Sequence, residues 1–149
     1  MIISRTYVIK HILLPYDGSD PANRAFEFAT ELAKLYKASV TVVTCIVIHA
    51  HVDPVLNVAF LETIKLQKED AKKATSKLES KLKEFGIQFK TEVLEAISIT
   101  DVLISYAESH NVDLIVIGSR GLGGFKKLLL GSVASGVSHH SKCPVLIIK

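Results

Sequence analysis

Glycine is concentrated in one segment of the sequence. GSRGLGGFKKLLLGSVASG, residues 118–136, holds six glycines in nineteen residues and directly follows the apolar run DLIVI at 113–117. Because glycine has no side chain, Gly121, Gly123 and Gly124 permit positive φ angles and let a ligand approach the backbone closely. The segment is therefore a candidate for binding a ligand through main-chain amides.

The end of this segment adds the start of a helix. Gly131 and Ser132 open a predicted short helix, whose first N–H groups have no intrahelical partner and carry the positive end of the helix dipole. Anions bind well at such a helix start. A phosphate chain held between Gly118 and Gly121 on one side and Gly131, Ser132 and Val133 on the other would satisfy these donors, with the Ser132 hydroxyl as a further partner.

The same composition also fits a surface loop that binds nothing, since glycine-rich loops are common without any ligand. Two well-known nucleotide signatures are excluded. The dinucleotide pattern GxGxxG is absent, and the P-loop pattern fails because Gly124 stands where a lysine must follow Gly123. From the spacing alone, a phosphate site and an unliganded loop both remain open.

Composition limits the classes of function. The 149 residues carry a formal net charge of +3 and no tryptophan, and the lysines between Lys65 and Lys90 alternate with acidic residues. Nucleic-acid binders more often show a basic stripe with interleaved aromatics, so we expect no nucleic-acid partner. Cys45 and Cys143 lack the spacing of a zinc site or a disulfide framework and suit a reducing cytoplasm. The apolar runs are too short for a membrane span, and we expect neither a membrane association nor a signal peptide.

Strands and helices alternate in the predicted order of elements. Buried strands are indicated by four apolar, β-branched runs: YVIKHILLP (7–15), SVTVVTCIVI (39–48), DLIVI (113–117) and PVLIIK (144–149). The run IQFKTEVL (87–94) alternates apolar and polar residues, which indicates a strand with one wet face at the edge of a sheet.

Four helices are predicted between these strands. They cover residues 20–36, 64–85, about 98–107 and about 132–140. Asp20 is the predicted N-cap of the first helix and Pro21 its first residue. Gly86 can end the second helix, and Ser98 with Asp101 forms a predicted capping box for the third.

This alternation predicts one α/β domain spanning 1–149, a Rossmann-like three-layer sandwich with a five-stranded parallel sheet between two layers of helices. In such sheets ligands bind beyond the carboxyl ends of the strands, where the direction of chain progression reverses. The glycine segment follows the fourth strand and therefore lies at that end of the sheet.

The glycine spacing carries a resemblance to a known family. Gly118, two residues, Gly121, nine residues, then Gly131 and Ser132 match the pattern G-2x-G-9x-G-(S/T) of ATP-binding members of the universal stress protein family. DLIVIGSRG, LLLGSVASGVSHHSKCPVLIIK and ILLPYDGSDPANRAFEFA also look like that family, so the resemblance covers nearly the whole chain. It implies the sheet order 3-2-1-4-5, ATP bound across the tips of the first and fourth strands, and a homodimer.

The resemblance also implies roles for individual residues. Pro15, Tyr16 and Asp17 would lie beside the nucleotide, with Asp17 near the ribose and a phosphate-bound Mg²⁺, which prefers oxygen ligands. The alternative role of Asp17 is that of a turn residue that caps the following helix. The backbone of Cys45 would read the adenine edge, and Ile117 would pack near the base or belong only to the core. The implied binding set is Pro15, Tyr16, Asp17, Cys45, Ile117, Gly118, Arg120, Gly121, Gly131, Ser132 and Val133.

Two features stand outside the family pattern. Ile97, Ser98 and Ile99 occupy the place where relatives often have Gly-x-Pro, and we expect them to narrow the adenine pocket. The loop after the second strand contains His49, His51 and Asp53. These residues form either a conceivable metal cluster or simply exposed loop side chains.

Together these observations predict a cytoplasmic, ATP-binding regulator or sensor of the stress response that is not an enzyme and takes ATP and Mg²⁺ as ligands. Three alternatives stay open. Water activated by Asp17 would make the protein a slow ATPase, although no GxSxG nucleophile elbow and no arginine clamp beyond Arg120 supports turnover. A phosphorylation receiver also has an aspartate after its first strand but usually needs paired acidic residues there. The glycine segment could instead dock a protein partner without any nucleotide.

The C-terminal run PVLIIK predicts an assembly. As the last strand it would form an exposed apolar edge of the sheet, and such edges invite aggregation. Pairing with its own copy across a two-fold axis would bury it, and two-fold dimers are the commonest symmetric assembly. We therefore expect a homodimer through the C-terminal strand.

Overall fold

The computed structural model describes residues 8–49, 58–123 and 129–149, and strands and helices alternate along them. In chain order the elements are β1 (His11–Pro15), α1 (Asp20–Tyr36), β2 (Ser39–Val47), α2 (Val58–Glu84), β3 (Phe89–Ala96), α3 (Ile99–Ser109), β4 (Leu114–Gly118), α4 (Ser132–His140) and β5 (Val145–Ile148). The sheet order is β3-β2-β1-β4-β5, and every pairing is parallel. The predicted single-domain α/β fold and strand order are confirmed.

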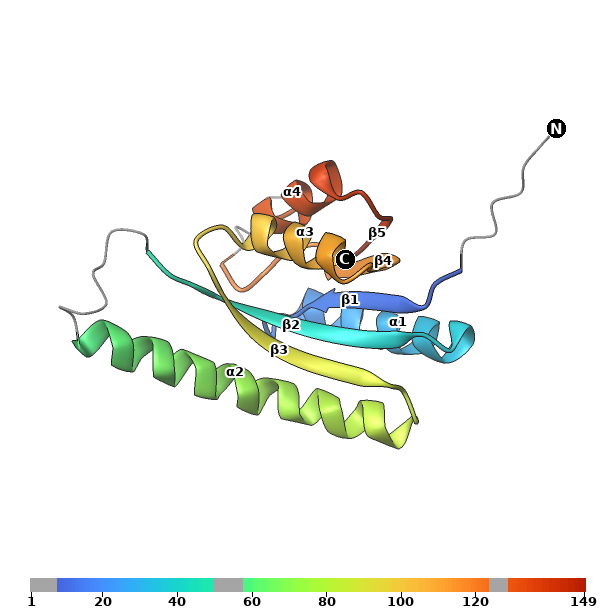
Figure 1. The fold of residues 1–149 in the computed structure, drawn as a ribbon, viewed down its shortest axis with the longest axis horizontal. Helices are drawn as coiled ribbons and strands as arrows, with labels where there is room; N and C mark the ends of the chain where they lie inside the picture. The colour runs from blue at the N-terminus through green and yellow to red at the C-terminus, as the bar shows by residue number, and fades with distance from the viewer. Residues whose placement is uncertain (1–7, 50–57, 124–128) are drawn as a thin grey trace.

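Helices cover both faces of the sheet, as Figure 1 shows, with α1 and α2 on one side and α3 and α4 on the other. Each face has its own hydrophobic cluster. Leu14, Phe26 and Leu82 belong to the cluster under α1 and α2, whereas Leu13, Leu103 and Ile115 belong to the cluster under α3 and α4. Neighbouring residues of β1 thus serve opposite faces, because side chains alternate along a strand.

Buried central strands and a wetter edge strand follow from the sequence pattern. All five residues of β4, LIVIG, are buried, as expected for an apolar strand between two helical layers. The predicted edge position of β3 is confirmed, since β3 lies at one end of the sheet. Along β3 most residues are half-buried, and polar contacts tie it to α2 through Glu95 with Lys68 and through Thr91 with Glu79.

Helix boundaries differ from the predictions in two places. The N-cap of α1 is Ser19, whose Oγ accepts a hydrogen bond from the Ala22 N–H at 3.3 Å, so the assignment of that cap to Asp20 was wrong. Helix α2 begins at Val58 rather than Ile64. The prediction missed this start because the first two turns of α2 carry exposed apolar side chains, which do not follow the spacing of a buried helix face. The predicted end is confirmed, since Gly86 takes a φ of 66° directly after the last turn.

The topology creates a crevice at one end of the sheet. From β1 the chain moves outward to β2 and β3, and then returns to the other side of β1 for β4 and β5. The direction of progression therefore reverses between β1 and β4, which end at Pro15 and Gly118. Loops that leave these two ends diverge, and this is where ligands bind in open α/β sheets. Among the helices described, none is long and apolar enough to cross a membrane.

Candidate ligand-binding site

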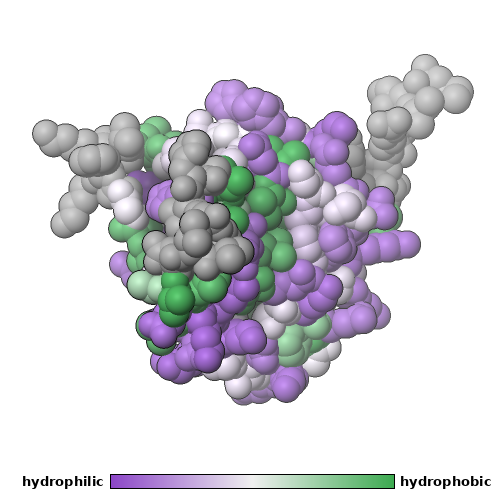
Figure 2. Space-filling model, turned by 60° about the vertical axis from the view of Figure 1, so that its left-hand side comes forward, coloured by the Kyte–Doolittle hydropathy of each residue, from purple (hydrophilic) through white to green (hydrophobic). Residues whose placement is uncertain are grey.

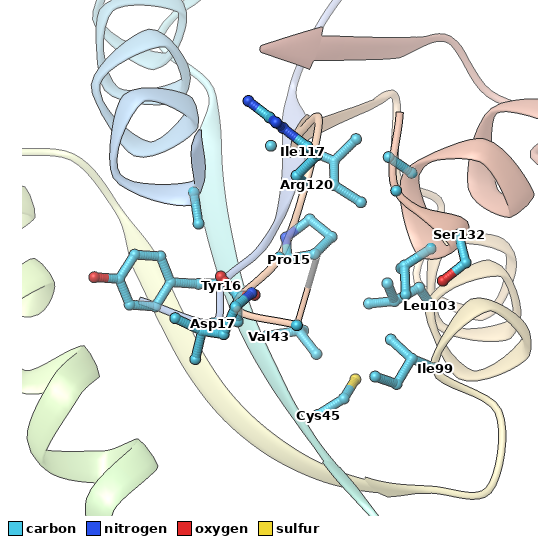
Figure 3. Close-up of a pocket in the computed structure, with 18 residues that line it drawn as sticks. Pro15, Tyr16, Asp17, Val43, Cys45, Ile99, Leu103, Ile117, Arg120 and Ser132 are labelled. Carbon is cyan, nitrogen blue, oxygen red and sulfur yellow. The ribbon is translucent and has the colours of Figure 1, made fainter. Parts of the chain in front are cut away.

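A cavity of about 510 Å³ lies at the carboxyl ends of β1, β2 and β4, against α3 and the start of α4 (Figure 3). Its volume falls in the range of small-molecule sites, roughly 300–1,000 Å³. Every residue of the predicted binding set lines it. Gly123, which the sequence indicated as a point of close backbone approach, also lines it, and the lining residues given no role from the sequence are Ala22, Val43, Leu103, Leu122 and Ala134.

One half of the cavity is apolar. Val43 and Cys45 from β2, Ile117 from β4 and Ile99 with Leu103 from α3 face it. Figure 2, which turns the left-hand side of Figure 1 forward, shows hydrophobic surface running down the middle of this side with hydrophilic surface around it. The apolar half of the cavity suits a flat apolar group such as a heterocyclic base. The spacing of Ile99 and Leu103, one helical turn apart, is the signal by which sequence reasoning could have found Leu103.

The end of β1 leaves main-chain groups of β2 facing the cavity. Along β2 the odd-numbered residues pair with β1, since Ser39 N–H donates to Lys10 O and Val43 O accepts from Tyr16 N–H. Even-numbered residues pair with β3, as the Ile48 N–H does with Ala96 O. The Cys45 N–H and C=O therefore point to the side of β1, beyond Pro15, which lies opposite Val43. They offer one donor and one acceptor next to the apolar half.

The other half of the cavity is built from backbone. Gly118, Gly121 and Gly123 line one side, and Gly131 with Ser132 lines the other. Helix α4 has no side-chain cap at its N-cap Gly131, so the N–H groups of its first turn face the cavity end without a capping side chain. The Gly131 N–H itself donates to Ser119 O at 2.7 Å. The donors left for a ligand are accordingly those of the helical residues, beginning with Ser132.

Gly118 and Gly121 are needed for close packing rather than for unusual backbone angles. Positive φ among the glycines described occurs only at Gly18 and Gly86, so the predicted use of positive φ at Gly121 and Gly123 was wrong; Gly124 lies outside the described residues. A Cβ on Gly118 would lie 2.7 Å from the Pro21 carbonyl carbon. Gly118 is thus the point where the start of α1 touches the end of β4.

Asp17 connects the turn after β1 with the segment after β4. Its Oδ1 accepts a hydrogen bond from the Ser19 N–H, and its Oδ2 accepts one from the Leu122 N–H, both at 3.0 Å. Ser19 adds a second link, because its Oγ lies 3.2 Å from the Arg120 carbonyl oxygen as a donor. Asp17 does stabilise the turn, as the structural alternative proposed, but it does not cap α1.

Tyr16 and Arg120, two residues of the predicted binding set, line the cavity, but their side chains extend away from its apolar half. Figure 3 shows the Tyr16 ring turned away from Val43 and Cys45, and its hydroxyl donates to Asn23 Oδ1 at 2.7 Å. Burial, and secondarily the charge of Asp17, raises the pKa of Tyr16. The Arg120 side chain likewise extends away from Val43 in Figure 3.

The structure also locates the residues that depart from the expected pattern. Ile99 lines the cavity, whereas Ile97 is 67% exposed and outside it, so only the former can narrow the apolar half. Of the conceivable metal cluster, His49 is exposed, and His51 and Asp53 lie outside the described residues. Within residues 8–49, 58–123 and 129–149, no three His, Cys, Asp or Glu side chains gather to hold a metal.

Comparison with known proteins adds a decisive match. Residues 9–149 match the sequence model of the Universal stress protein family. The chain belongs to this family. Universal stress protein MJ0531 of Methanocaldococcus jannaschii is 33% identical over 140 residues, which cover 94% of this chain and 82% of that protein.

Solved structures of universal stress proteins share the fold. UspA from Lactobacillus plantarum superposes with a TM-score of 0.87 at 29% identity, covering 94% of this chain and 97% of that one. A universal stress protein from Archaeoglobus fulgidus, solved in complex with dAMP, gives a TM-score of 0.65 at 25% identity, covering 96% and 99% of the two chains.

Proposed function

We propose that this universal stress protein binds ATP in the cavity between β1 and β4 and acts as a nucleotide-dependent regulator or sensor of the stress response. The observation that carries the proposal is the division of one cavity into an apolar half and a backbone-lined half that ends at an uncapped helix. A nucleotide has the same division into a base and a phosphate chain. The dAMP complex of the Archaeoglobus fulgidus relative supports an adenine nucleotide as the ligand class.

Each half has groups that suit its part of the nucleotide. Ile117 and Leu103 would pack on the base, and the Cys45 N–H and C=O would pair with its polar edge, since adenine offers a ring-nitrogen acceptor beside an amino donor. The first N–H groups of α4 and the Ser132 hydroxyl would bind phosphate oxygens. Gly121 and Gly131 let the segment after β4 pack close to Asp17 and to the start of α4, so that both backbone walls would face the phosphate chain.

The carboxylate of Asp17 gives a reason to include a metal ion. It lines the phosphate half of the cavity, where its charge would repel a triphosphate. A divalent cation between them removes this repulsion, and carboxylate, hydroxyl and phosphate oxygens are the ligands Mg²⁺ prefers. Asp17 would hold the ion, with Ser132 within the same cavity, and bound Mg²⁺ would neutralise phosphate charge.

Binding rather than turnover is the proposed mode of action. Among the described residues that line the cavity, Asp17 is the only carboxylate and none is a histidine or lysine, so an Asp17 that holds Mg²⁺ leaves no side chain positioned as a general base. We propose that occupancy by ATP, in a cytoplasmic homodimer, alters the surface offered to a protein partner. A slow ATPase remains the second candidate, because Asp17 lies beside the proposed phosphate site.

The experiment that tests the proposal is identification and measurement of the nucleotide. Protein purified without added nucleotide is denatured and its extract is analysed by chromatography and mass spectrometry; titration calorimetry then measures ATP, ADP, AMP and adenosine with Mg²⁺. Intact ATP in the extract and tightest binding of ATP are expected. Absence of binding of every adenine nucleotide contradicts the proposal, and ADP that accumulates during incubation favours the ATPase.

Ser132 provides a sharper version of this test. The change Ser132→Ala removes one hydroxyl from the phosphate half, and a hydrogen bond to a charged group contributes about 1.5–3 kcal/mol. ATP should bind roughly tenfold to a hundredfold more weakly, and adenosine should bind as before. Ser138→Ala is the matched control, since Ser138 lies on the same helix with its hydroxyl bonded to Ser135 O. Equal losses for ATP and adenosine would show that Ser132 does not bind phosphate.

A further inference from the structure

The carboxylate of Asp17 joins two segments that are far apart in the sequence. Asp17 Oδ2 accepts the Leu122 N–H at 3.0 Å, across 105 positions of the chain. The neighbouring Ser19 hydroxyl donates to Arg120 O at 3.2 Å. The turn after β1 therefore holds residues 120–122 against itself by two hydrogen bonds.

The same segment covers the carboxylate. A Cβ added to Gly121 would lie 2.6 Å from Asp17 Oδ2, so the Gly121 backbone passes directly over this oxygen. A magnesium ion binds carboxylate oxygen at roughly 2.1 Å and keeps several of its waters. Such a hydrated ion cannot share that side of Oδ2 with the Gly121 and Leu122 backbone in its present place.

We propose that Asp17 is a latch on residues 120–122, and that Asp17 releases Leu122 when it ligates the Mg²⁺ of a bound triphosphate. The inference rests on the proposed function, because it needs a nucleotide in this cavity. In the latched state Asp17 holds the segment; in the released state Asp17 holds the metal, and the segment adopts a second position. Ligands without a metal-bound phosphate chain leave the latch closed.

The latch gives the protein a way to distinguish nucleotides by their charge and metal content. Adenosine and AMP can fill the apolar half, next to Ile117 and Leu103, but they bring no metal-bound phosphate chain to Asp17. Only Mg²⁺ with a phosphate chain competes with the Leu122 N–H, so only that ligand moves residues 120–122. Leu122 is 75% exposed, and its side chain therefore changes position on the surface, where a partner can detect it.

The test removes the Leu122 donor and leaves Asp17 intact. Leu122→Pro deletes the N–H, and Leu122→Ala is the matched control that keeps it while removing the exposed side chain. Because the closed latch opposes metal binding, Leu122→Pro should bind ATP with Mg²⁺ about threefold to tenfold more tightly than Leu122→Ala. Both variants should bind adenosine equally, and ATP in EDTA equally.

Nuclear magnetic resonance supplies a second readout on the wild-type chain. The Leu122 amide signal should shift when ATP and Mg²⁺ are added together and stay in place with adenosine, while signals of Ile117 shift with both. Asp20→Asn is a control for the specificity of the response, because Asp20 lies in the first turn of α1 and does not line the cavity; this variant should show the same shifts as the wild type.

The possible failures are distinguishable. If wild-type protein binds no adenine nucleotide, the proposed function fails and the latch fails with it. If it binds ATP but the two Leu122 variants have equal affinity for ATP with Mg²⁺, or the proline variant binds more weakly, the function stands and the latch is overturned.

Discussion

Cys45 lies in the apolar half of the cavity, where burial raises the pKa of its thiol to about 11. An uncharged thiol belongs beside an apolar group, and the residue therefore contributes as a small hydrophobic surface with useful main-chain groups. The thiolate is the form that reacts with alkylating agents. Cys45 should accordingly be slow to react at neutral pH although it lines an open cavity.

We predict this behaviour in a labelling experiment. At pH 8 iodoacetamide should modify Cys45 about a hundredfold more slowly in the folded protein than in urea, and the rate should keep rising tenfold per pH unit to about pH 11. Site-resolved mass spectrometry measures the rates, and the urea-unfolded chain is the control. A rate that levels off near pH 9 would show an unperturbed thiol.

The sequence identified residues that line the cavity, but partly for a different physical reason. The spacing of Gly118, Gly121 and Gly131 identified the cavity wall, and the helix start at Ser132 was correct. What could not be foreseen is why each glycine is required: Gly121 because it passes over Asp17, and Gly118 because α1 touches β4 there. These contacts join residues about a hundred positions apart, so no local pattern reports them.

The contact between α1 and the end of β4 is the first feature at the scale of elements. A Cβ on Gly118 would lie 2.7 Å from the Pro21 carbonyl carbon and 2.8 Å from the Ala22 nitrogen. Both are backbone atoms, which cannot rotate away as a side chain can. The start of α1, including the Ser19 cap, is thus seated on the strand that precedes the glycine segment.

The change Gly118→Ala should therefore destabilise the fold. Overpacking of this kind costs about 1–3 kcal/mol in free energy of unfolding. Gly123→Ala is the matched control, because a Cβ there meets nothing within 4 Å, and it should change the stability by less than about 1 kcal/mol. Urea unfolding followed by circular dichroism measures both. Equal stability of the two variants would show that α1 can shift at no cost.

Element order was predictable because the apolar runs of this chain are long and well separated by turn residues. The start of α2 was not predictable from spacing, since Val58 and Leu61 are 68% and 49% exposed and break the buried pattern. The N-cap of α1 was ambiguous because Ser19 and Asp20 are both good caps, and only the Ser19 Oγ reaches the Ala22 N–H. Val43 and Ala134 were missed because tertiary packing, and not local spacing, decides which residues of β2 and α4 meet the cavity.

At the scale of the whole molecule, β5 lies at the end of the sheet, opposite to β3. Apolar surface continues beside it on α1. Arg24 Nε donates to Lys149 O at 2.6 Å, so this face of α1 borders the end of β5. Phe28 and Leu35, 54% and 73% exposed, follow Arg24 on the same helix face by spacing. An apolar edge strand next to an apolar helix stripe is a surface that a second copy can cover.

The homodimer expected through β5 can be tested at the backbone. The Ile115 N–H donates to Pro144 O, and the Ser119 N–H donates to Ile148 O. The main-chain N–H and C=O groups of the even-numbered residues of β5 therefore point toward β4. The Ile147 N–H and C=O consequently point outward, toward the place of a partner strand. Ile147→Pro removes the outward donor and keeps the bonds to β4, whereas Ile147→Ala removes more of the side chain than the proline change does and keeps the donor. We expect wild type and Ile147→Ala to have twice the 16.3 kDa mass of one chain in sedimentation velocity at tens of micromolar, and Ile147→Pro to have the single mass with an unchanged circular dichroism spectrum.

Two outcomes would contradict this prediction. A monomeric wild type would contradict the dimer itself. A dimeric Ile147→Pro would place the interface away from β5, because loss of the central N–H donor weakens any strand pairing at that edge.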